Sequence, residues 1–254
     1  MIRLKTEKQI DGIRKSCKML SAMYRDIIPL VKPGIETKEL EKRARDWIRR
    51  AGGKPAFLGY GPNKNPFPAA LCISINNTVI HGIPSGRKIA DGDLVSLDCG
   101  IDLDGFISDQ AVTIEAGKVS QAARNLNKVT RECLYKGIEA VKSGDRLLQI
   151  ARAVSGHAEP FGYGVVYQYC GHGVGLSLHE DPSVPNTPHG SNPRMMAGMV
   201  IAIEPMINAG AGDVELLDDG WTVVTADDTL SAHWEHTVAI FHDHAEILTD
   251  DIHL

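Results

Sequence analysis

The stretch DLVSLDCGIDLDGFISDQAVTI, residues 93–114, decides the fold of this chain. Two runs of alternating or β-branched residues flank Asp104-Gly105, a favoured two-residue turn between antiparallel strands. The stretch therefore predicts a β-hairpin in which Leu103 faces Phe106. A bulge would shift this register.

Two aspartates lie on this hairpin. The register places Asp98 opposite Ala111 and Asp109 opposite Gly100, so the aspartates are diagonal neighbours on one face, with Cβ atoms roughly 7–8 Å apart. Two carboxylates at that separation can reach two divalent ions about 3.5–4 Å apart. Without a cation they would repel each other and be costly to bury. A pair of ordinary acids at a solvated edge is the alternative, although Asp is depleted in strand interiors.

Three further residues have the character of metal ligands. Glu204 ends the apolar run MVIAIE, Glu235 begins a strand in AHWEHTVAIF, and His172 lies between glycines in YCGHGVG, where it is poorly placed for core packing. Taken alone, each glutamate is better explained as a salt-bridged or capping residue. Four carboxylates, one imidazole and no cysteine suit two first-row divalent ions that activate water, which indicates hydrolysis rather than redox chemistry.

Other histidines carry weaker signals. His81, in NNTVIHGIPSG, is by itself no more than a turn residue, and His179 follows His172 by seven positions. His233 and His236 flank Glu235 and are either supports for the ligands or exposed. GHGVG lacks the spacing of a dinucleotide loop, and a Cys170 nucleophile is disfavoured because residues close together on a strand point apart.

Size and composition are those of an ordinary globular protein. The chain has 254 residues, 43% hydrophobic and 23% charged, and we expect one domain over residues 1–254. Its net charge of −5 argues against DNA binding through a general positive field, while a local basic patch for RNA remains open. With no apolar span and five scattered cysteines, a cytoplasmic location, reduced thiols and no membrane contact are expected.

Helix signals alternate with strand signals in an α/β (α+β) pattern. We expect a helix over residues 6–31 with a Thr6/Gln9 capping box, a second N-capped by Thr37, a third over 120–141 and a shorter one N-capped by Asp145. Strands are expected over residues 70–75, 94–99, 106–114, 200–203, 221–225 and 235–241. The segments 59–68 and 182–195 read as long loops. There is a weak internal similarity between SLDCGIDLDGF and AIEPMIN…DDGWTVV. Two structurally related halves would explain it.

Taken in order, these motifs resemble the type I methionine aminopeptidases of the M24 metallopeptidase family. The resemblance covers nearly the whole chain and rests on CISINNTVIHGIP (72–84), GDLVSLDCG…DGFISD (92–109), YCGHGVG…HEDP (169–182), IEPMIN (203–208) and GWTVVTADDTLSAHWEHT (220–237). It implies the pita-bread fold, a curved and mostly antiparallel sheet with pseudo-twofold halves backed by helices.

The resemblance also implies roles for individual residues. The metal ligands would be Asp98, Asp109, His172, Glu204 and Glu235, with Asp109 and Glu235 bridging two ions of Co, Mn, Fe or Zn. His81 and His179 would contact the substrate near the scissile amide, and Glu204 would shuttle the proton after a metal-bridged hydroxide attacks. The methionine pocket would be walled by Tyr60, Phe67, Cys72 and Trp221.

The implied activity is removal of the N-terminal methionine from nascent proteins whose second residue is small. A monomer is expected, and a transient ribosome contact is left open. Leu178 stands where phenylalanine is common, Phe57 where cysteine is common, and Gln110 where a small residue is frequent. The loop 60–67 is longer than in compact bacterial members. These departures from the usual family pattern affect the expected shape of the methionine pocket.

Two other readings stay open. A prolidase or Xaa-Pro aminopeptidase shares this fold and ligand set, but usually carries an additional N-terminal domain. A non-catalytic binding protein could use the same fold, but such relatives typically lose metal ligands, whereas all five are present here.

Overall fold

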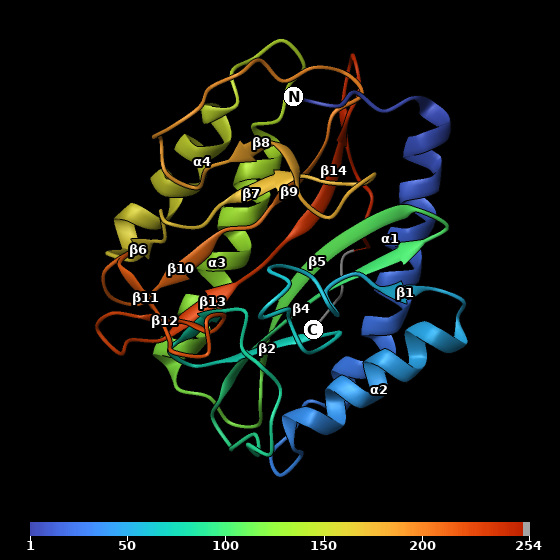
Figure 1. The fold of residues 1–254 in the computed structure, drawn as a ribbon. Coiled ribbons are helices and arrows are strands. Elements are labelled where there is room, and N and C mark those ends of the chain that lie inside the picture. The colour runs from blue at the N-terminus through green and yellow to red at the C-terminus, as the bar shows by residue number, and fades with distance from the viewer. Residues whose placement is uncertain (251–254) are drawn as a thin grey trace.

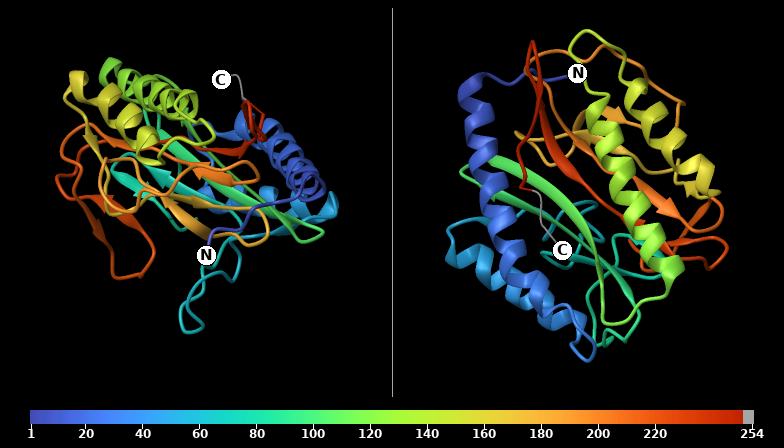
Figure 2. Two further views of the ribbon diagram at one scale, coloured as in Figure 1. Left: turned by 90° about the horizontal axis from the view of Figure 1, so that it is seen from above. Right: turned by 180° about the vertical axis from the view of Figure 1, so that it is seen from behind.

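The computed structural model describes residues 1–250, in which four α-helices lie on one side of several antiparallel sheets (Figures 1 and 2). The helices are α1 (Glu7–Ile27), α2 (Thr37–Arg50), α3 (Gln121–Glu139) and α4 (Leu148–Ala158), with 3-10 turns η1 (Ile28–Leu30) and η2 (Glu159–Phe161) after α1 and α4. No helix within residues 1–250 is long and apolar enough to cross a membrane.

The predicted hairpin is the centre of the first sheet. Strand β4 (Leu94–Leu103) pairs with β5 (Phe106–Glu115) on one edge, and with β1 (Lys54–Pro55) and β2 (Cys72–Ile75) on the other. Leu103 faces Phe106 as predicted, because Asp104 and Gly105 both adopt the positive φ that a tight turn of this kind needs.

The second large sheet has the order β15-β14-β9-β7-β8. Its strands are β7 (Gly171–Gly173), β8 (Glu180–Val184), β9 (Val200–Ile203), β14 (His236–Ile240) and β15 (Ala245–Ile247). Two smaller sheets lie beside it: β6 (Gly164–Val165), β10 (Met206–Asn208) and β13 (Ser231–His233), then β3 (Thr78–Ile80), β11 (Val214–Leu216) and β12 (Val223–Thr225).

The core lies between the helices and the sheets. Apolar faces of α1, α2, α3 and α4 pack with side chains of both large sheets in one cluster that includes Leu20, Leu97, Leu126, Val154 and Ile203. The opposite face of the sheets is therefore left for the loops, and residues 59–68 project from it (Figure 2).

Helix starts were predicted with mixed success. The Thr6/Gln9 capping box and the Ser120 N-cap are both present. Thr37 is instead the first residue of α2, because its hydroxyl is engaged with the backbone of Ser85. The Asp145 cap is also wrong: α4 begins at Leu148, whose N–H donates to Asn192 Oδ1 from a distant loop.

Strand ends differ from the prediction in several places. The segment 182–195 is not all loop, because residues 182–184 belong to β8, in which Val184 pairs with Gly171 of β7. The strand expected from Trp221 begins at Val223. The strand expected from Glu235 begins one residue later, and Glu235 itself forms an isolated bridge to Ala111. That bridge joins the hairpin to the second half of the chain.

Candidate metal centre

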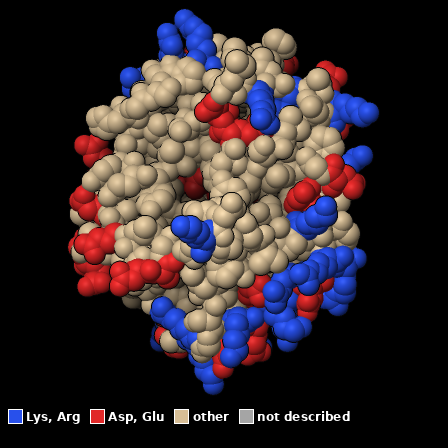
Figure 3. Space-filling model, viewed as in Figure 1, with Lys and Arg blue, Asp and Glu red and all other residues tan. Residues whose placement is uncertain are grey.

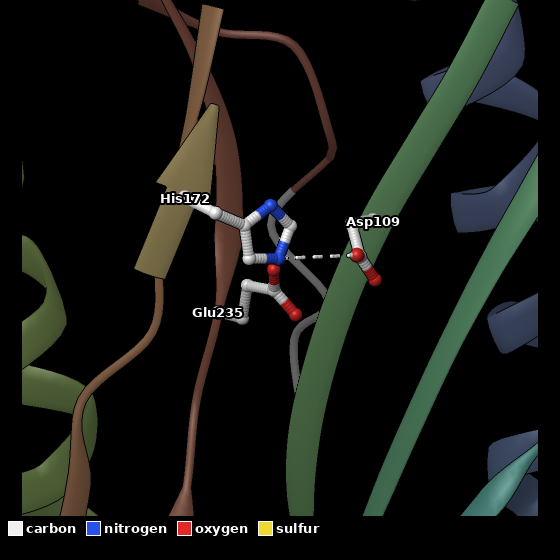
Figure 4. A group of neighbouring side chains, drawn as sticks. All are labelled: Asp109, His172 and Glu235. Carbon is white, nitrogen blue, oxygen red and sulfur yellow. Dashed lines mark ion pairs between the residues drawn. The ribbon is translucent and has the colours of Figure 1, made fainter. Parts of the chain in front are cut away.

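Five side chains converge where the hairpin meets the second large sheet. They come from β4, β5, β7, the residue after β9 and the link between β13 and β14, and are Asp98, Asp109, His172, Glu204 and Glu235. Figure 4 shows three of them, Asp109, His172 and Glu235, pointing toward one another. One ligand atom from each of these three lies within 4.8 Å of the others. Residues far apart in sequence therefore form one cluster.

The imidazole lies among the carboxylates. His172 Nε2 is 3.4 Å from Glu204 Oε1 and 3.8 Å from Asp109 Oδ2. Its Nδ1 lies 2.9 Å from the carbonyl oxygen of Gly173, an arrangement that favours the proton on Nδ1 and leaves Nε2 free to bind a metal. Nε2 of His172 is thus directed into the cluster.

Several buried oxygens in the cluster lack hydrogen-bond donors. Within the described part of the chain, Asp98 Oδ1, Asp109 Oδ1 and Glu235 Oε1 are buried without a hydrogen-bond partner. Native proteins rarely leave buried polar atoms unsatisfied. The donor set, oxygen-rich with one imidazole, fits divalent cations, which would satisfy these atoms.

Burial dominates the electrostatics of the carboxylates. It raises the pKa of Asp98 to about 7, with His233 opposing the shift, and the pKa of Glu204 to about 8. Burial and the neighbouring carboxylates hold the pKa values of Asp109 and Glu235 well above their ordinary range. A bound cation reverses this tendency and keeps all four ionised.

Burial also keeps the histidines neutral. It lowers the pKa of His172 to about 3 and that of His81 to about 4, and it lowers the pKa of His179. Neutral imidazoles can bind a metal or donate a hydrogen bond at neutral pH.

Backbone contacts hold the cluster in place. The Asp109 N–H donates to Thr237 Oγ1 at 3.2 Å, and the Thr237 hydroxyl donates to the Asp109 carbonyl at 2.7 Å. The Glu235 N–H donates to the Ala111 carbonyl at 2.9 Å. The strand that carries Asp109 and the link that carries Glu235 are therefore tied together at the site.

The glycines around His172 allow close backbone contact. A Cβ atom at Gly171 would lie 2.3 Å from the Ala202 carbonyl oxygen, and one at Gly173 would lie 2.4 Å from that of Asp181. Gly175 adopts a φ of +130°. Close backbone approach at Gly171 and Gly173 and an unusual φ at Gly175 therefore account for the glycines of this segment.

A cavity of about 200 Å³ adjoins the five side chains. The Tyr60 ring lies 5.0 Å from that of His179, and Phe67 packs edge-on against Trp221 at 5.2 Å. Cys72 also lines the cavity, so the structure brings together every residue predicted for the pocket. Figure 3 shows the face with a central hollow and acidic atoms at its base.

The loop of residues 59–68 shapes the cavity rim. Trp221 Nε1 donates to the Asn65 carbonyl at 3.0 Å. Gly61 packs so closely on Trp221 that a Cβ atom would lie 2.4 Å from the ring. The predicted loop is thus held against the wall of the cavity.

His81 is set in a constrained turn. It adopts a φ of +58°, unusual for a residue with a side chain, and its ring lies edge-on to Tyr169 and Trp221 at about 6 Å. The next residue, Gly82, leaves no room for a Cβ atom, which would lie 2.3 Å from the Ile73 carbonyl oxygen. The turn directs His81 into the cavity.

The unusual residues of the motifs fall into two groups. Phe57 and Leu178 are buried beside Phe67 and Cys72 in the apolar wall of the cavity. Gln110 points away from it, because its side chain bonds to Ser21 and the Asp250 carbonyl. Only the first group therefore contacts the cavity.

Sequence reasoning missed part of the cavity lining and left the placement of two histidines undecided. Tyr169 and Ile80 line the cavity and were not singled out, although Tyr169 stands three residues before His172 in the quoted motif. His233 and His236 are both buried, so the exposed alternative is wrong. The alternative of a solvated edge for the aspartate pair is also wrong, since Asp109 is only 3% exposed.

Comparison with known proteins defines the class. Residues 11–241 match the model of metallopeptidase family M24. The methionine aminopeptidase of Treponema pallidum is 54% identical over 252 residues, 98% of this chain and 97% of that protein. The chain belongs to metallopeptidase family M24.

Solved structures agree with this assignment. The crystal structure of methionine aminopeptidase from Thermotoga maritima superposes with a TM-score of 0.94 at 38% identity, covering 99% of this chain and 100% of that one. The prolidase of Pyrococcus horikoshii OT3 shares the fold, with a TM-score of 0.79, 22% identity and coverage of 98% of this chain but 64% of that one. The expected pita-bread architecture is confirmed.

Proposed function

We propose that this chain removes the N-terminal methionine from polypeptides whose second residue is small. The single observation that carries the proposal is the buried cluster of four carboxylates and one imidazole with unpaired oxygens, opening into an aromatic cavity. High identity to a methionine aminopeptidase over nearly the full length supports the choice of substrate.

The proposed centre holds two divalent ions. Asp109 and Glu235 would be shared, Asp98 would complete one site, and His172 with Glu204 would complete the other. Bound ions of Mn, Fe, Co or Zn supply Lewis acidity, which activates water and polarises the amide. Metal analysis of the purified protein, with an expected ratio near two ions per chain, tests the stoichiometry.

The residues around the cavity move protons and orient the amide. Glu204, which a bound cation would keep ionised, is suited to take a proton from the attacking water and return it to the leaving amine. His179, whose ring lies 4.1 Å from that of His172, would donate to the amide carbonyl oxygen. His81 would hydrogen-bond near the scissile nitrogen.

The cavity wall suits an unbranched thioether. Tyr60, Phe67 and Trp221 supply polarisable aromatic surface, against which a methionine sulfur packs favourably. Leu178 and Phe57 complete the wall and would set its depth.

Hydrolysis of tripeptides tests this proposal. We expect cleavage of Met-Ala-Ser, little cleavage of Met-Lys-Ser, and loss of both after treatment with a chelator. Turnover that resists chelation contradicts the metal mechanism.

The prolidase alternative predicts a different preference. A peptide panel with proline in second place, compared with methionine in first place, separates the two activities. Preferential cleavage before proline would replace the present proposal. Absence of all peptide hydrolysis in the metal-loaded protein would favour the non-catalytic reading.

A further inference from the structure

His233 is a buried histidine whose side chain lies on the ligand side of its strand. It ends β13, and because strand side chains alternate, it shares a face with Glu235 two residues later. Trp234, between them, points the other way and donates from Nε1 to Asn127 Oδ1 on α3. His233 is 1% exposed, so its imidazole belongs to the interior around the five ligands.

The backbone of His233 is fixed to the hairpin. Its N–H donates to Thr113 Oγ1 at 3.0 Å, and the Thr113 hydroxyl donates to its carbonyl at 2.8 Å. Thr113 stands on β5, four residues after Asp109 and on the same face. Two hydrogen bonds thus set the position of His233 relative to the strand that carries Asp109.

Glu204 lies between two imidazoles. Its Oε1 is 3.4 Å from His172 Nε2, and its Oε2 is 3.6 Å from His233 Nε2. Two donors that bind one ion at 2.0–2.2 Å lie about 3.0–3.4 Å apart at ordinary coordination angles. The 3.4 Å between Glu204 Oε1 and His172 Nε2 therefore suits two ligands of one metal ion. Glu204 Oε2 is directed toward His233.

The nitrogen that faces Glu204 lacks a hydrogen bond in the described structure. His233 Nε2 is buried and makes no hydrogen bond to residues 1–250. A buried unpaired donor is costly. A movement of roughly 0.7 Å would bring it to hydrogen-bond distance from Glu204 Oε2.

We propose that His233 is a positioning residue that donates from Nε2 to Glu204 Oε2 and thereby turns Oε1 toward the metal bound by His172. This rests on the proposed metal centre. Histidine or carboxylate ligands are commonly oriented by such outer hydrogen bonds, whose loss typically costs 10–100-fold in metal affinity.

Titration of the metal-free protein with Co(II) tests this role. The variants are His233→Leu, which has no donor, and His233→Gln, which keeps one. We expect about a tenfold or greater loss of Co(II) affinity in His233→Leu, with an altered visible absorption spectrum, and a change under about threefold in His233→Gln. Thermal unfolding of each metal-free variant checks that it is folded.

His236→Gln is the matched control. His236 is also buried and flanks Glu235, but its Nδ1 bonds to Thr249 and its Nε2 lies 3.3 Å from the Tyr135 hydroxyl. We expect this change to alter thermal stability while leaving Co(II) affinity and spectrum unchanged.

Two outcomes overturn the inference. Unchanged Co(II) affinity and spectrum in His233→Leu would show that the imidazole does not act on the centre. Equal losses in the Leu and Gln variants would show a role other than hydrogen-bond donation. Either result leaves the proposed peptidase activity intact, whereas Co(II) binding without methionyl-peptide cleavage would reject the activity and leave this inference standing.

Discussion

Buried carboxylates occur in two neighbouring regions of this molecule with opposite electrostatics. At the metal centre, burial raises the pKa of Glu204 to about 8 and that of Asp98 to about 7. Glu180 follows His179 directly and its side chain is only 3% exposed, yet its pKa lies below the ordinary value. Depth of burial alone therefore does not decide whether a carboxylate is ionised.

Hydrogen-bond and charge partners account for the difference. Burial by itself raises the pKa of Glu180, but Lys5 Nζ at 2.9 Å and the N–H groups of Leu176 and Ser177 outweigh it. The centre has unpaired oxygens instead. A buried acid with its own partners is structural, whereas acids left without partners mark a site for a cation.

Removing a carboxylate that we propose to bridge the two ions should have the largest effect. We expect Asp109→Asn to lower peptidase activity by about 10³-fold or more, because the change disrupts the ions that activate water. Steady-state assays with a methionyl tripeptide measure this. Glu115→Gln on the same strand, which removes only a partly exposed pair with Arg124, is the control and should keep activity. Comparable activity in both variants would refute the role of Asp109.

Removing Lys5 should leave Glu180 buried without a cation, as the carboxylates of the centre are in the metal-free protein. We expect Lys5→Met to lower the free energy of unfolding by about 3 kcal/mol, because it leaves a buried carboxylate without its cation. Urea denaturation measures the change. The double variant Lys5→Met/Glu180→Gln should recover part of the loss. A loss below about 0.5 kcal/mol, typical of a surface pair, would contradict this account.

The metal-free protein should lose stability as pH rises from about 7 to 8. Glu204 and Asp98 have folded pKa values above their ordinary 4.5 and 3.8, so the folded state holds more protons than the unfolded chain. His172 and His81 act oppositely, but only below about pH 6.5. We expect a loss on the order of 1 kcal/mol by thermal or urea unfolding. Saturating Mn(II) should abolish it, and a metal-independent slope would count against the centre.

An exposed ion pair should contribute least to the free energy of unfolding. Lys42 and Asp46 lie four residues apart on α2, with the side chains 69% and 43% exposed. We expect Lys42→Met to change the free energy of unfolding by less than about 0.5 kcal/mol, since solvent screens the pair. A loss comparable to that of Lys5→Met would remove the distinction between buried and exposed partners.

The hairpin could be predicted to the residue because its determinants are local. Asp104-Gly105 sets the turn, and alternation along the two strands then places Asp98 and Asp109 on one face. The ligand set as a whole came from resemblance, since nothing local to Glu204 or Glu235 distinguishes a ligand from a salt-bridged glutamate.

Features that depend on distant partners could not be predicted. The N-terminus of α4 is capped by Asn192, 44 positions away from Leu148. The strand over residues 180–184 forms because β7 lies beside it, although Pro182 within it and Pro185 directly after it are typical of a loop. His233 carried one readable signal, its alternation with Glu235, but its contact with Glu204 exists only after folding.

Anomalous diffraction from crystals grown with Mn(II) is the decisive test of the metal centre. We expect two peaks at the manganese edge, both enclosed by Asp98, Asp109, His172, Glu204 and Glu235. Strong peaks elsewhere, with none among these side chains in an active protein, would contradict it.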